Sequence, residues 1–327
     1  MFKKFWKTLK FFIAIAIVLI VLPHSILPGR SSDIKKEVLE EYVKLNDSEK
    51  RLPEYKDDEE ALKAKLLQLE VINLSRKKNN APAVKLDILA SRVANKMCRE
   101  AAENDFIGHW NTAGEKPYHR YAFAGGFDHI SENAYGEWSS ADYSSSPAVI
   151  NSMMKTGHNK FMMEKPPADG HRKTIIDKPH NFVGIGYYLR GKQFRYYEEF
   201  IDRYLEFENI PSEVTTGESF SITVKTEKES FLYYLTAYRD EFPEAIPPAK
   251  LKNKGGYTDY TNEQTSRLNP WDLAQYRRGN IYTIPLSFSK PGLYYLHIYI
   301  DDKEVANASS MNTKGKTQAS GIVIKVD

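Results

Sequence analysis

The sequence has 327 residues, enough for two domains, and its 41% hydrophobic and 27% charged residues are typical of a chain that buries a core. Its net charge is +3, but four lysines lie in the first ten residues, so the rest of the chain is close to neutral. This leaves no basic field for nucleic acid, and we expect no nucleic-acid partner.

Residues 1–30 have the pattern of an export segment. The four lysines precede an uninterrupted apolar run from Phe11 to Leu22, which is shorter than the roughly 20 residues that span a bilayer. One small-residue pair, Gly29 and Ser31, has the spacing of a cleavage site. The segment is therefore predicted to be either a cleaved signal peptide or an N-terminal membrane anchor. In both cases the protein is expected outside the cytoplasm, secreted or tethered to the membrane.

The next part of the chain predicts a spacer and then a mixed domain. Residues 31–61 mix charges of both signs with few large apolar side chains, which predicts a solvated helical spacer. Apolar residues then recur at helical spacing, with helices expected over about 86–104 and 148–163. The run "NFVGIGYYLRGKQFRYYEEF" predicts two strands joined by a turn at Arg190 to Lys192. We expect the first domain to span residues 62–203.

Residues 204–327 change character. Runs such as "SFSITVKT", "IYTIPLSF" and "LYYLHIYID" are rich in strand-forming residues and separated by turn residues, which predicts an all-β sandwich of immunoglobulin-like type. Residues 241–280 interrupt this pattern, and a loop of such length is usually functional or mobile. A fragment that ends near Arg203 is expected to fold by itself, because both helices and the closing hairpin lie within it.

The single cysteine and the absence of common motifs narrow the chemistry. Cys98 cannot form an internal disulfide and lies in a helical pattern, so we expect a buried apolar role. The sequence has no GxSxG, Walker, HExxH, CxxC or GxGxxG motif. What remains is a spaced set: His109 in "FIGHW", Glu132 in "ISENAYG" and His171 in "ADGHRKTII". Each lies next to glycine or turn residues, which would place a polar side chain at the rim of a core.

The order of these segments resembles the CAP superfamily, the SCP-like extracellular domain shared by plant pathogenesis-related and cysteine-rich secretory proteins. "FIGHW" with "GEKPYHRY", then "SENAYG", then "GHRKTII" with "VGIG" are similar to the bacterial type of this family over about residues 62–203. The resemblance implies an α+β fold, a CAP-type α-β-α sandwich, here followed by an all-β sandwich-like domain. It also implies that His109, Glu132 and His171 line one groove.

The chain departs from the family pattern around the second histidine. "SEN" stands in place of the family's "GEN", and the second acid of the family tetrad has no clear counterpart, Glu164 being the nearest acid. "GHNKFMM" nearly repeats "GHRKTII", so His158 is a rival of His171, which we prefer because "VGIG" follows it at the family distance. Three further histidines fall outside these motifs and are not assigned to the groove: His119, His129 and His180.

Two imidazoles and one or two carboxylates in a groove suit a divalent cation, zinc above all, with one position left open. The predicted metal ligands are His109, His171 and Glu132, with Glu164 and His158 as secondary candidates. One interpretation is a protein that binds an extracellular or envelope ligand, which could be a lipid, a glycan or a protein. The other is a metal-dependent hydrolase, a protease or a cell-wall-directed enzyme, in which Glu132, His109 and His171 are the catalytic candidates. The same groups could also form a hydrogen-bonded structural knot.

Overall fold

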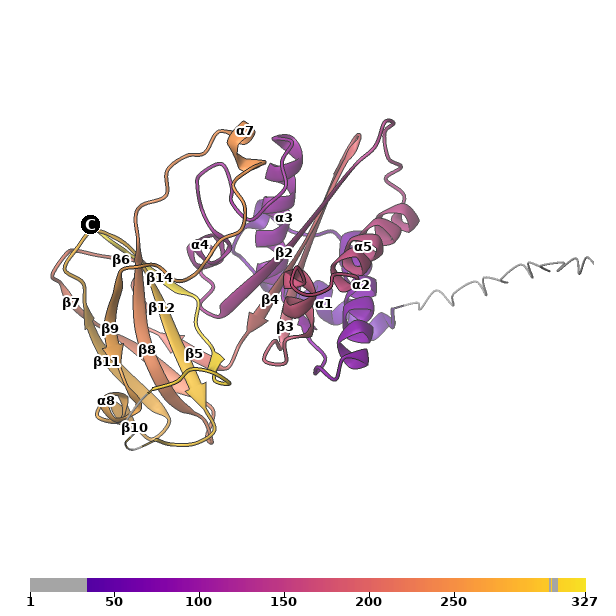
Figure 1. The fold of residues 1–327 in the computed structure, drawn as a ribbon. Helices are drawn as coiled ribbons and strands as arrows, with labels where there is room; N and C mark the ends of the chain where they lie inside the picture. The colour runs from indigo at the N-terminus through magenta and orange to yellow at the C-terminus, as the bar shows by residue number, and fades with distance from the viewer. Residues whose placement is uncertain (1–33, 306, 308–310) are drawn as a thin grey trace, which may run out of the picture. The chain divides into compact units, whose positions relative to one another are not determined.

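The computed structural model describes residues 34–305, 307 and 311–327 (Figure 1). The predicted export segment, residues 1–30, lies outside them. Within the described ranges, every helix is too short or too polar to cross a bilayer.

A four-stranded sheet with helices on both faces forms the α-β-α part, residues 34–203 (Figure 1). Its strand order is β1-β3-β4-β2, antiparallel except for the parallel pair of β1 and β3. The strands are β1 (Lys85–Leu86), β2 (His129–Trp138), β3 (Phe182–Arg190) and β4 (Gln193–Asp202). The helices are α1 (Lys36–Ser48), the short 3₁₀ helix η1 (Pro53–Tyr55), α2 (Glu59–Lys78), α3 (Ile88–Glu103), α4 (Pro117–Phe123), α5 (Pro147–Met162) and α6 (Gly170–Ile176).

Strand β3 explains how helices cover both faces of this sheet. Val183 and Ile185 are fully buried in the cluster that α2 and α5 form, whereas Gly184 and Gly186 face α3. A Cβ atom on Gly184 would lie 2.4 Å from the carbonyl carbon of Ala90, so only glycine lets α3 approach this closely. The alternation in "VGIG" thus builds one apolar face and one close-packed face, and the predicted α-β-α sandwich is confirmed.

Helix α1 packs on the sheet part, which differs from the solvated spacer predicted for residues 31–61. Tyr42 lies against the cluster of α2 and the sheet. Arg92 of α3 is buried and donates to the backbone carbonyls of Asn46 and Arg51, at 2.7 and 2.6 Å. A buried guanidinium needs such acceptors, and the end of α1 and the turn after it supply them. The charged composition of the segment concealed the few apolar side chains on which this packing depends.

Residues 204–327 form the β-sandwich part, which contains two sheets. One has the order β10-β11-β7-β5, and the other has the order β6-β14-β12-β8-β9 with β13 beside β12. In β11 buried and exposed residues alternate, and Tyr282, Ile284 and Leu286 enter a core shared with residues of the second sheet. The predicted all-β sandwich is therefore confirmed. Its elements are β5 (Leu205–Glu208), β6 (Glu213–Val214), β7 (Ser219–Thr226), β8 (Phe231–Asp240), α7 (Pro248–Leu251), β9 (Gln264–Leu268), α8 (Pro270–Ala274), β10 (Arg277–Arg278), β11 (Ile281–Ser287), β12 (Gly292–Asp301), β13 (Thr317–Gln318) and β14 (Ile322–Val326).

One apolar cluster contains residues of both parts. Leu89 and Tyr118 of the α-β-α part pack with Leu293, Tyr295 and Val323 of the β-sandwich part. The rings of Tyr118 and Tyr295 stack with centroids 4.2 Å apart, and both are 1% exposed. Each part therefore supplies apolar surface that covers the other.

This shared cluster changes the expectation for a fragment that ends at Arg203. Removal of Leu293, Tyr295 and Val323 would expose apolar surface on the remaining part, at about 1.5–3 kcal/mol for each large side chain uncovered. We expect the fragment 34–203 to unfold at a clearly lower urea concentration than the chain 34–327, measured by circular dichroism. Equal midpoints would instead support the independent folding predicted from the sequence.

Candidate functional site

His109 lies in the loop between α3 and α4, and the backbone around it is fixed from two sides. Gly108 has a φ of +148°, a region in which other residues are strained. The Tyr197 hydroxyl donates to the Gly108 carbonyl at 2.7 Å, and the Arg120 guanidinium donates to the His109 carbonyl at 2.7 Å. The imidazole therefore has a set position.

Glu132 of β2 orients this imidazole. Its side chain is fully buried, its Oε1 lies 2.8 Å from Nδ1 of His109, and its Oε2 accepts a hydrogen bond from Arg120. Arg120 lies on α4, whose first residue is Pro117, a favoured residue at that position of a helix. The segment "EKPYHRY" after His109 thus builds the short helix that carries a guanidinium to the acid.

Glu199 of β4 lies directly opposite Glu132 in the antiparallel ladder, and both are buried. When two buried carboxylates share a site, the charge of one raises the pKa of the other. Burial and the charge of Glu132 raise the pKa of Glu199 well above its usual range. Burial acts against ionisation of Glu132 too, but Arg120 and the His109 hydrogen bond outweigh it and lower the pKa of Glu132. The raised pKa of Glu199 favours its neutral form, and among the described residues neither of its oxygens has a hydrogen-bond partner.

His171 is held in the same manner at the start of α6. Its Nδ1 lies 2.5 Å from Oε1 of Glu164, and Oε2 of Glu164 accepts the backbone N–H of His171 at 3.0 Å. A carboxylate at this position satisfies a backbone N–H that the first turn of a helix leaves free. The Phe161 ring stacks on the imidazole with centroids 4.7 Å apart. Glu164 therefore orients His171 as Glu132 orients His109.

The two imidazoles lie on the wall of one cleft. Their ring centroids are 6.4 Å apart, and the cavity has a volume of about 510 Å³. In the part of the chain that the structure describes, no hydrogen bond engages Nε2 of either ring. The lining contains three acids and neither Lys nor Arg: His109, Ile130, Ser131, Glu132, Asn133, Glu164, Ala168, Gly170, His171, Thr174, Tyr257 and Asp259.

His158, the rival of His171, lies away from this cleft. It is fully buried, with Nδ1 at 2.7 Å from Glu198 and Nε2 at 2.9 Å from the Ser75 hydroxyl. Successive residues of a strand point to opposite faces, so Glu198 and Glu199 serve different faces of the sheet. His158 belongs to the face of α2 and α5, where it completes a buried polar contact.

The three unassigned histidines also lie outside the cleft lining. His129 and His180 share one acid, with their Nδ1 atoms 2.8 and 2.6 Å from the two oxygens of Asp202. His119 of α4 is buried, with Nε2 at 3.3 Å from Asp240. Their acids make all three part of the packing between elements.

Among the ligands predicted from the sequence that line the cleft, the donor atoms without a hydrogen bond in the described structure are the two Nε2 atoms. Both oxygens of Glu132 are engaged, and Glu164 contacts His171 through both of its oxygens. Across residues 34–305, 307 and 311–327, no group of three His, Cys, Asp or Glu side chains is arranged to hold a metal ion. Imidazole nitrogens with carboxylates on their other nitrogens still fit the donor chemistry of zinc.

Four residues that line the cleft or lie behind Glu132 were not predicted from the sequence: Arg120, Glu199, Tyr257 and Asp259. Arg120 had a signal, since it lies in the segment that resembles the family. Glu199 lies in the run "RYYEEF", where two acids in a strand of buried aromatic residues require partners. Tyr257 and Asp259 lie in the long interruption of the β-rich region, and no local pattern places them beside His109.

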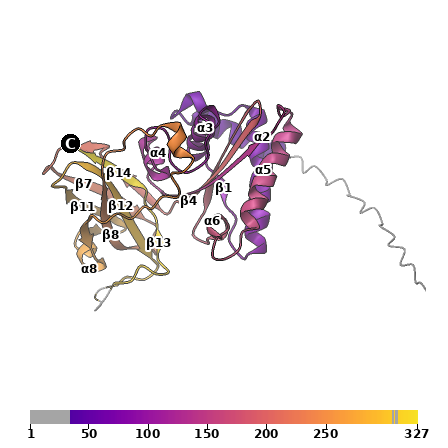
Figure 2. The same ribbon diagram turned by 45° about the horizontal axis from the view of Figure 1, so that its top comes forward.

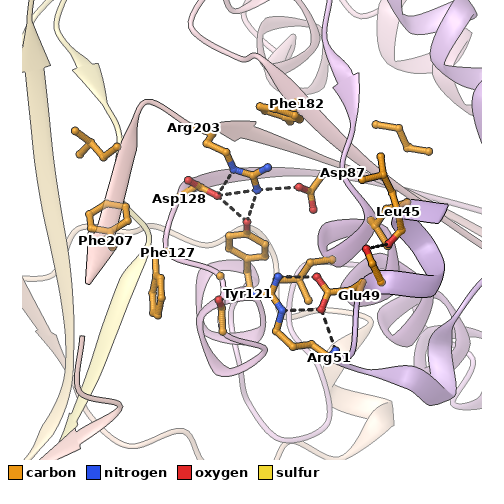
Figure 3. A pocket seen from close by; sticks show the side chains of 17 residues that line it. Leu45, Glu49, Arg51, Asp87, Tyr121, Phe127, Asp128, Phe182, Arg203 and Phe207 are labelled. Carbon is orange, nitrogen blue, oxygen red and sulfur yellow. Dashed lines mark hydrogen bonds and ion pairs between the residues drawn. The ribbon is translucent and has the colours of Figure 1, made fainter. Parts of the chain in front are cut away.

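A second cavity, of about 540 Å³, has lining residues on α1, β5 and the start of α3 (Figure 3). The Arg203 guanidinium lies between Asp87 and Asp128, at 2.8 and 2.9 Å. Arg51 pairs with Glu49 at 2.6 Å. Because these charged side chains pair with one another, the cavity is less suited than the histidine cleft to select a ligand.

Comparisons with known proteins find one family model and several solved structures that match part of the chain. The family model described as the cysteine-rich secretory protein family, CAP, matches residues 69–200. Among solved structures, an extracellular protein with an SCP domain from Bacillus anthracis is 18% identical, with a TM-score of 0.31. The match covers 42% of this chain and 39% of the Bacillus chain. An outer surface protein from Borrelia burgdorferi is 20% identical, with a TM-score of 0.32. The match covers 42% of this chain and 91% of the Borrelia chain. This chain thus matches well under half of the Bacillus protein. No curated protein matches.

Proposed function

We propose that this chain, whose residues 69–200 belong to the cysteine-rich secretory protein (CAP) family, is an extracytoplasmic binding protein that holds its ligand in the cleft between His109 and His171. The observation that carries the proposal is the matched pair of contacts, in which each imidazole uses Nδ1 for a buried or half-buried carboxylate and leaves Nε2 for the cavity. The basic and apolar start of the chain supports a place outside the cytoplasm. The ligand is a component of the envelope or of the surroundings of the cell.

A divalent cation, zinc above all, fits this pair. His109 and His171 would hold the ion through Nε2, and Glu132 and Glu164 would fix the orientation of the two rings, as carboxylates do behind metal-bound histidines. Glu132 then acts through His109, a role that differs from the metal ligand predicted from the sequence. Bound zinc would supply free coordination positions for a donor atom of the ligand.

The environment of Glu132 favours binding over hydrolysis. A general base works best when its pKa lies near the operating pH. The pKa of Glu132 is lowered below its usual range, and both of its oxygens are held by His109 and Arg120. A hydrolase that uses this cleft would need a different base.

Calorimetric titration with zinc tests the proposal. We expect His171→Ala to weaken zinc binding at least tenfold, because one imidazole remains of the two that the cleft offers. Lys173→Ala is the matched control, since Lys173 lies on the same helix with its side chain 66% exposed, and should bind as the unaltered protein does. Equal affinities in all three proteins would remove the metal from the proposal.

A further inference from the structure

Residues 241–263, here called the strap, connect β8 to β9 and contact the α-β-α part along their length. The Ile246 N–H donates to the Thr112 carbonyl at 2.8 Å, and the Lys252 ammonium pairs with Asp105 at 2.6 Å. Leu251, in the strap's helix α7, is 3% exposed in a cluster with residues of α3. Figures 1 and 2 both show α7 beside α3. The strap is thus fastened by buried apolar contacts and by hydrogen bonds.

The strap delivers two side chains to the histidine cleft. The ring of Tyr257 meets that of His109 edge-on, with centroids 5.2 Å apart. Asp259 lines the same cavity, and its carbonyl lies 3.0 Å from Nε2 of the buried His297 on β12. Just before Tyr257, the Gly256 carbonyl accepts the indole N–H of Trp110 at 3.2 Å. Contacts on both parts of the chain therefore hold this wall of the cleft in place.

Asp259 also changes the charge of the cleft. With it, three acids line the cavity, and none of the lining residues is Lys or Arg. The buried Arg120 offsets one of these charges from behind Glu132, and Nε2 of His129 lies 3.9 Å from the carboxylate of Asp259. A cleft lined by one sign of charge attracts groups of the opposite sign and repels groups of the same sign.

We propose that the strap is the specificity-determining wall of the cleft: Tyr257 restricts access to His109, and Asp259 makes the metal-free cleft select cationic over anionic ligand groups. The inference rests on the proposed function for the existence of a ligand. It deepens that function by naming the class, a ligand portion that carries an ammonium group, in preference to a phosphate or a carboxylate.

The test uses small nitroxide probes and needs neither ligand nor metal. Protein with ¹³C-labelled histidine is mixed with an amino-, an uncharged or a carboxy-substituted piperidine nitroxide of nearly equal size, and NMR measures the relaxation enhancement at the His109 and His171 ring protons. We expect at least a twofold larger enhancement from the cationic than from the anionic probe. Asp259→Asn should reduce this ratio at least twofold, because it removes one unit charge that attracts the cationic probe and repels the anionic probe. Glu244 is an exposed acid of the strap outside the cleft lining, so Glu244→Gln should leave the ratio unchanged.

The uncharged probe tests the wall itself. In Tyr257→Ala, the relaxation enhancement that the uncharged probe causes at the His109 ring protons should at least double. Tyr257→Phe keeps the ring and should match the unaltered protein. Equal enhancement by the cationic and anionic probes would overturn the charge selection. An unchanged enhancement at His109 in Tyr257→Ala would overturn the claim that Tyr257 restricts access to His109. The ratio of cationic to anionic enhancement in the unaltered protein tests the charge selection even if Asp259→Asn does not fold. The nitroxide experiment contains no zinc. Its outcome therefore does not depend on whether the zinc titration detects binding.

Discussion

Replacement of Arg120 by methionine should lower the free energy of unfolding by about 3–5 kcal/mol, the usual cost of removing one partner from a buried ion pair. The side chains of Arg120 and Glu132 are 3% and 0% exposed, so solvent cannot take the place of the guanidinium. The change also removes the donor to the His109 carbonyl. Urea unfolding at pH 7, followed by circular dichroism, measures the loss.

A double variant separates the buried charge from the lost packing. In Arg120→Met combined with Glu132→Gln, no unpaired carboxylate remains, so we expect part of the stability to return relative to the single variant. A single variant that loses less than about 1 kcal/mol would mean that the pair contributes little, and that another contact fixes the acid behind His109.

Much of the fold could be predicted because local patterns and tertiary packing agree. The alternation in "FVGIGYY" indicated a strand, and the same glycines prove to be the residues that let α3 approach the sheet. The hairpin turn falls between Arg190 and Gln193, as predicted. Cys98 is fully buried, also as predicted. The charged segment of α1 was misread because a few apolar side chains and the buried Arg92 decide its packing, and composition averages over them.

The site was partly accessible from the sequence. His109, Glu132 and His171 do line one cleft with Glu164, since motif order reflects topology. The contribution of the strap could not be predicted, because Tyr257 lies 148 positions from His109 and reaches it through the packing of one part on the other. Nor does a local pattern indicate the raised pKa of Glu199, which depends on the register of β2 and β4.

Asp202 should give the protein a pH-dependent stability that Asp202→Asn removes. Asp202 is 3% exposed and accepts hydrogen bonds from His129 and His180. Burial opposes its charge, but the two histidines outweigh burial and lower the pKa of Asp202 well below its usual range. Burial likewise opposes a charge on His129, yet the hydrogen bond and the charge of Asp202 raise the pKa of His129.

The signs of the two shifts define the pH window. A lowered acid pKa stabilises the fold above the unfolded value near 4 and loses that effect as the pH falls below it. A raised histidine pKa stabilises the fold below the unfolded value near 6.5 and loses that effect as the pH rises through the folded value. The free energy of unfolding of the unaltered protein should therefore exceed that of Asp202→Asn by about 2–4 kcal/mol between pH 4 and 6.5, and by less above pH 8.

Urea unfolding of both proteins from pH 3.5 to 8.5 measures this difference, with Glu229→Gln as the control because Glu229 is an exposed acid in a loop. The control should follow the unaltered protein at every pH. A constant difference between the unaltered protein and Asp202→Asn would mean that the substitution acts through packing alone. Side-chain packing, and not the charge of Asp202, would then stabilise the contact between His129, His180 and the end of β4.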